Sequence, residues 1–62
     1  MRTELEIRER QKNHLEALLT IKLLNISSNV KGIDEAIKRA IVPMEQEDIA
    51  WVEKIVGVKA ID

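Results

Sequence analysis

Few side chains in this sequence are suited to catalysis. His14 is the only histidine, and histidine alone has an ordinary pKa near neutrality. On a helix its neighbours would be Arg10, Gln11, Ala17 and Leu18, none of which is a nucleophile or an orienting carboxylate. We therefore expect His14 to be an ordinary surface residue, and we predict no catalytic residue and no enzymatic activity.

The other polar clusters have simpler structural explanations. Ser27 and Ser28 lack a glycine elbow and are typical of a helix-ending turn. The acidic run 45–48 lacks the alternating oxygen ligands and central glycine of a calcium loop. Lys31 and Gly32 lack the glycine-rich lead-in of a phosphate loop. The sequence thus predicts no metal site and no cofactor.

The size and composition of the chain favour a small intracellular protein that assembles. A chain of 62 residues forms at most one domain, and such chains usually need a disulfide, a metal or oligomerisation for stability. The sequence has no cysteine and only one histidine, which leaves oligomerisation. No apolar run is long enough to cross a membrane, so we expect a cytoplasmic protein. Ten Lys and Arg against 11 Asp and Glu give a net charge of -1. This balance, with Trp51 as the only aromatic residue, disfavours nucleic acid as a partner.

The N-terminal part of the chain is expected to form one long helix, from about residue 3 to 26. Thr3 and Glu6 match a capping box at its start. Two pairs at i, i+4 spacing, Glu4 with Arg8 and Glu6 with Arg10, would support it. The polar cluster 27–29 is expected to end it.

Two shorter helices are expected to follow, over about 33–41 and 43–56. Gly32 provides the break before the first, Pro43 suits the first turn of the second, and Gly57 ends it. The 33–41 segment has a single apolar stripe, made of Ile33, Ile37, Ala40 and Ile41. The whole chain, 1–62, is therefore predicted to be one all-α domain with a long N-terminal helix and two shorter helices.

The long helix has two apolar stripes on nearly opposite sides. The first contains Leu15, Leu18, Leu19, Leu23 and Ile26, and the second contains Ala17, Ile21 and Leu24. One stripe suffices for the core of a monomer, so we predict that the second lies at an interface in a homodimer or higher oligomer. The alternative is that the two shorter helices cover both stripes within one monomer.

The last helix is also broadly apolar. Met44, Trp51 and Ile55 lie on one flank, and Ile49, Val52 and Val56 on the other. We predict that the first flank, Met44, Trp51 and Ile55, contributes to the same interface.

The run from Arg8 to His14 contains no apolar residue and is expected to extend away from the core. It is either a solvated extension or a surface that presents Arg8, Arg10, Lys12 and His14 to a partner. Our leading interpretation is a non-enzymatic protein–protein interaction module, acting as a regulator, inhibitor or adaptor through an oligomer. It would bind a further protein through this polar run or through the acidic face of the last helix. The alternative is a nucleic-acid-associated transcriptional regulator that uses a dimerised basic N-terminal helix.

Overall fold

The computed structural model describes residues 3–24 and 31–60, and within them it contains only helices. The helices are α1 (Glu4–Leu24), α2 (Lys31–Ile41) and α3 (Gln46–Val56). The all-α class and the long N-terminal helix of 21 residues are as predicted. The predictions for Ile26 and for the turn at 27–29 concern residues outside the described part of the chain.

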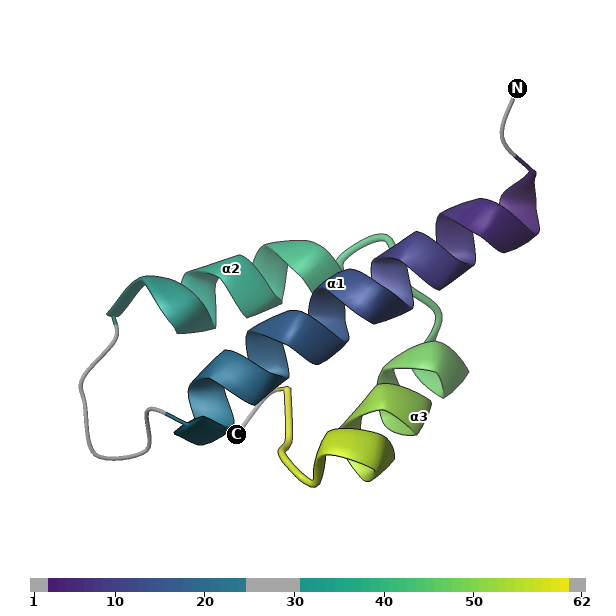
Figure 1. Ribbon diagram of the computed structural model, residues 1–62. Coiled ribbons are helices and arrows are strands. Elements are labelled where there is room, and N and C mark those ends of the chain that lie inside the picture. Colours follow the sequence, from purple (N-terminus) through teal and green to yellow (C-terminus); the bar gives the residue numbers. More distant parts are fainter. Residues whose placement is uncertain (1–2, 25–30, 61–62) are drawn as a thin grey trace.

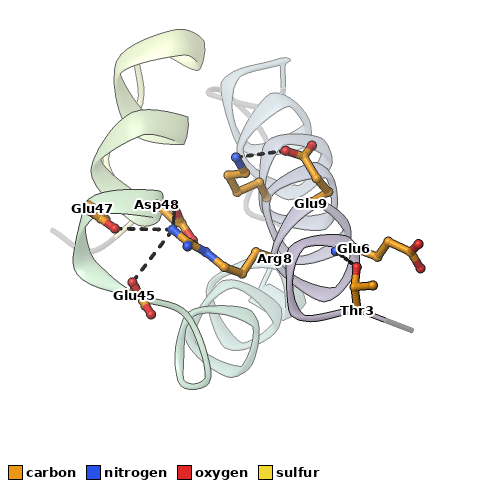
Figure 2. Close-up of polar contacts among 8 residues, drawn as sticks. Thr3, Glu6, Arg8, Glu9, Glu45, Glu47 and Asp48 are labelled. Atoms are coloured by element: carbon orange, nitrogen blue, oxygen red, sulfur yellow. Dashed lines mark hydrogen bonds and ion pairs between the residues drawn. The ribbon is translucent and has the colours of Figure 1, made fainter. Parts of the chain in front are cut away.

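Thr3 caps the start of α1, which confirms its half of the predicted capping box. Its hydroxyl Oγ1 accepts a hydrogen bond from the backbone N–H of Glu6 at 3.2 Å (Figure 2), and its carbonyl accepts one from Ile7 N at 3.1 Å. A hydroxyl at this position satisfies a backbone donor that has no partner within the helix. The helix therefore begins at a position fixed by local chemistry.

Both shorter helices begin elsewhere than predicted. Helix α2 starts at Lys31 and includes Gly32, which was expected to precede it. Helix α3 starts at Gln46, because Met44 N donates to the Ile41 carbonyl at 3.0 Å and closes a tight turn that contains Pro43. The proline thus belongs to the connection and not to the first turn of α3.

The end of α3 is where the sequence predicted it. Gly57 has a φ of 80°, the left-handed conformation that glycine adopts without steric cost, and its N–H donates to the Glu53 carbonyl at 2.8 Å. The chain then turns back, and the backbone N–H of Ala60 donates to Glu53 Oε2 at 2.6 Å. This bond places Ala60 in the core.

The two shorter helices pack against α1, which runs between them (Figure 1). Helix α2 runs antiparallel to α1, and α3 runs roughly parallel to it. The core they enclose is small and consists of Leu15, Leu19, Ile37, Met44, Val52 and Ala60. Leu18 packs partly against it. Among the described helices, none combines the length and hydropathy that a membrane-spanning segment requires.

The line of α1 that faces the core differs from the predicted stripe at its C-terminal end. It continues from Leu15 and Leu19 to Lys22, whose Nζ lies 3.5 Å from Asp34 Oδ1 on α2. Leu23 is exposed, because it follows Lys22 directly and is rotated by about 100° around the helix axis from this line.

Candidate functional site

Arg8 of α1 contacts three carboxylates at the start of α3. Its Nη2 lies 2.9 Å from Asp48 Oδ1, 3.3 Å from Glu47 Oε1 and 3.8 Å from Glu45 Oε2, and its Nε donates to Asp48 Oδ2 at 3.0 Å. Figure 2 shows the guanidinium reaching across to these side chains. We call these four residues the Arg8 cluster. The expected helical pair of Glu4 with Arg8 is absent among the described ion pairs, since Arg8 is held by α3.

The electrostatics of the Arg8 cluster are those of a structural ion pair. The hydrogen bonds from Arg8 hold the pKa of Asp48 below its ordinary value, against the opposing effect of burial. The same pair raises the pKa of Arg8. Both groups therefore remain charged at neutral pH, and neither is suited to proton transfer.

Lys12, a second predicted partner-binding residue, is also engaged within the chain. Its Nζ lies 3.2 Å from Glu9 Oε1 and 4.7 Å from the centroid of the Trp51 ring. The second contact is a cation–π interaction. The expectation that the polar half of α1 extends away from the core is therefore wrong for Arg8 and Lys12, both of which lie against α3.

Arg10 and His14, the remaining predicted partner-binding residues, line a groove of about 600 Å³ between α1 and α2. We call it the α1–α2 groove. Helix α1 also contributes Ile7 and Gln11 to it, and the other side is formed by Ala36, Arg39, Ala40 and Pro43. The small side chains of Ala36 and Ala40 do not fill the space between the helices, which leaves the groove open.

The α1–α2 groove combines basic side chains with an apolar part, which we call its floor and which consists of Ile7, Ala36, Ala40 and Pro43. Its lining contains two arginines and a histidine but no carboxylate. Neither Arg10 nor Arg39 forms an ion pair with another described residue. Arg10 and His14 were predicted partner-binding residues, but Arg39 was not. The two alanines beside Arg39, Ala36 and Ala40, are four residues apart, and this spacing is a signal in the sequence for a shallow surface on α2.

The second predicted stripe of α1 lies on the side that α2 and α3 leave uncovered. Ala17 is exposed, Ile21 is 43% exposed and Leu24 is 78% exposed. The alternative in which the shorter helices cover both stripes does not fit this arrangement. Beside the stripe is a shallow hollow of about 450 Å³, lined by Asn13, Glu16, Ala17, Thr20 and Ile21.

The predicted interface residues of the last helix are separated in the structure. Met44 is only 8% exposed and belongs to the core, so its assignment to an interface was wrong. The reason is that Met44 precedes α3 and is turned inward by its bond to Ile41, whereas the prediction placed it on the helix. Trp51 and Ile55 are both about half-exposed.

No metal centre is found in the described part of the chain, where no three His, Asp or Glu side chains gather in a suitable arrangement. Comparison of the sequence and fold with protein-family models, curated proteins and solved structures finds no match. The candidate sites are therefore the α1–α2 groove and the uncovered stripe of α1.

Proposed function

We propose that this protein is a non-enzymatic helical interaction module. It would form a homodimer and bind a further protein as a regulator, inhibitor or adaptor. One observation carries the proposal: both shorter helices pack against α1, and Ala17, Ile21 and Leu24 nevertheless remain exposed on it. Exposed aliphatic side chains in a row are typical of an interface.

The partner that best fits the exposed stripe is a second copy of the chain. The stripe combines a protruding side chain, Leu24, with a hollow around Ala17 on the same face. In an antiparallel pair of α1 helices, Leu24 of each copy would enter the hollow of the other, with the two-fold axis between Thr20 and Ile21. Such a self-complementary face produces a closed dimer.

Charge and size also favour self-association. Ala17, Thr20, Ile21 and Leu24 are uncharged, so Glu16 is the one charged side chain among the residues of the stripe and its hollow. Burying a side chain such as Leu24 contributes roughly 1.5–3 kcal/mol. That is a large share of the stability expected for a domain with so small a core.

The surroundings of His14 are the reason for proposing a module without enzymatic activity. The lining of the α1–α2 groove offers it neither a carboxylate to orient the ring nor a hydroxyl to activate. The residues around His14 are suited to binding an anion.

The nucleic-acid alternative remains a hypothesis with less support. It depends on the basic residues of the N-terminal helix, and two of these, Arg8 and Lys12, are engaged with α3 and with Glu9. Binding through them would require these contacts to break. A gel-shift experiment at low salt tests this alternative, since phosphate contacts are strongest there.

The test of the dimer is the double substitution Ile21→Glu with Leu24→Glu, followed by sedimentation analysis. We expect the wild type to sediment as a dimer and the variant as a folded monomer, with folding checked by circular dichroism. The matched control is Leu5→Glu with Val42→Glu, which changes leucine and valine side chains that are 68% and 82% exposed and lie outside the stripe. A wild-type monomer at every accessible concentration, or equal dissociation of the control, would overturn the proposal.

A further inference from the structure

The α1–α2 groove has the two properties of a site for an acidic, partly apolar ligand. Its floor includes the exposed aliphatic side chain of Ile7 and the half-buried Ala36 and Ala40. Arg10 and Arg39 line it from opposite helices. We propose that this groove binds an acidic segment of a partner protein, seating an apolar side chain on the floor and holding a carboxylate through Arg10 and Arg39.

The groove differs from the rest of α1 in whether its basic residues form ion pairs within the chain. Arg8 and Lys12 are neutralised by carboxylates of this chain, whereas Arg10 and Arg39 have no described ion pair. Glu6 and Glu35 lie four residues before them on the same helices, but helical pairs of this kind are worth only about 0.2–0.5 kcal/mol. A bound carboxylate would compete with such pairs easily, because arginine can hold it through two parallel hydrogen bonds.

A protein segment fits this groove better than a nucleic acid. The apolar floor suits a leucine or isoleucine side chain, which a phosphate backbone does not provide. Beyond Arg10 the surface carries Glu6 and Glu9 around Leu5, and these carboxylates would repel an extended polyanion. Trp51, the only Phe, Tyr or Trp in the sequence, is on α3, so the groove offers a base no ring for stacking except the His14 imidazole.

The inference rests on the proposed function in treating the protein as a binding module, but the groove and the hollow beside the stripe share no residue. The two can therefore fail separately. If Arg10→Gln with Arg39→Gln abolishes partner binding while the chain still sediments as a dimer, both proposals stand. A monomeric wild type that still binds acidic peptides through the groove would overturn only the dimer.

The experiment is a selection of random short peptides displayed on phage against the immobilised wild-type chain. We expect enriched peptides to combine Asp or Glu with Leu or Ile. Titration of a selected peptide should shift the backbone amide resonances of Ile7, His14, Ala36 and Ala40. Arg10→Gln with Arg39→Gln should weaken this binding at least about tenfold, through the loss of charge-assisted hydrogen bonds.

The matched control is Lys38→Gln with Lys54→Gln, which removes the same charge from two exposed side chains outside the groove and should change affinity less than about twofold. The proposal is overturned if no peptide is enriched over the support, if the enriched peptides lack carboxylates, or if the arginine variant binds as tightly as the wild type. It is also overturned if a short single-stranded oligonucleotide, and not the peptide, shifts the groove resonances.

Discussion

Arg8 and Asp48, 40 residues apart in the sequence, form a two-point ion pair that joins α1 to α3. Arg8 Nε and Nη2 donate to the two oxygens of the carboxylate at 3.0 Å and 2.9 Å. Asp48 is the only buried charged residue in the described part of the chain, and this pairing provides the partners that a buried carboxylate requires. The position of α3 along α1 therefore depends on a polar contact as well as on Val52.

The Arg8–Asp48 pair predicts a loss of stability in acid. Because the pKa of Asp48 is lowered in the folded protein, its contribution is present above the ordinary value of 3.8 and is lost as the pH falls through the lower folded value. Arg8 stays charged throughout. Asp48→Asn should lower the melting temperature at pH 7. The difference in melting temperature between the variant and the wild type should become smaller as the pH falls below 3.8. Thermal unfolding of both proteins across this pH range measures this difference. A melting-temperature difference that does not change with pH would contradict the ion pair between Arg8 and a charged Asp48.

The sequence could predict the local features of the fold but not this pair. The ends of helices at Thr3 and Gly57 follow from capping chemistry within a few residues, and the core position of Ile37 follows from helical periodicity. Arg8 instead matched a helical pair with Glu4, because a single sequence shows neighbours along a helix and not contacts made by folding. The polar half of α1 was for that reason expected to be free of the core.

The error at Met44 has a similar origin. The helical wheel was extended to Pro43, and this assigned Met44 to an exposed flank. The bond from Met44 to Ile41 lies in a turn, where helical periodicity no longer applies. The α1–α2 groove was also not predictable, since it arises where residues from two helices meet.

The core is so small that truncating a single core side chain should strongly destabilise the fold. Leu19→Ala removes a side chain with no solvent exposure and should destabilise the fold by about 2–5 kcal/mol. Leu5→Ala, at an exposed position of the same helix, should cost less than about 0.5 kcal/mol. Urea unfolding followed by circular dichroism measures both. Similar losses in the two variants would mean that Leu19 does not lie in the core.

The two glycines predict opposite responses to the same substitution. Gly57→Ala places a side chain at a φ of 80° and should destabilise the protein by about 1 kcal/mol, although no atom lies within 4 Å of the added Cβ. Gly32 lies within α2, and there too the added Cβ meets nothing within 4 Å. Gly32→Ala should therefore stabilise by up to about 1 kcal/mol, because alanine favours the helix. The urea midpoints of both variants show whether each substitution stabilises or destabilises the protein. A change in the same direction for both variants would contradict the backbone conformations of Gly32 and Gly57.

The return of the chain after α3 depends on Glu53, which predicts how fast the Ala60 amide exchanges with solvent. Glu53 Oε2 accepts the hydrogen bond from Ala60 N at 2.6 Å, and Ala60 is buried in the core. Hydrogen bonds to charged groups contribute roughly 1.5–3 kcal/mol, which corresponds to about a tenfold to hundredfold change in an opening equilibrium. Glu53→Ala should accelerate amide exchange at Ala60 by about that factor.

The matched comparison is Glu53→Gln, which keeps an oxygen acceptor of the same length without the charge and should give an intermediate rate. The Val52 amide, one residue earlier and within α3, reports whether the whole helix has loosened. Acceleration confined to Ala60 would mean that Glu53 holds the terminal turn against the core. Equal acceleration at Val52 would mean that Glu53 stabilises α3 itself, and the account of the turn would then be wrong.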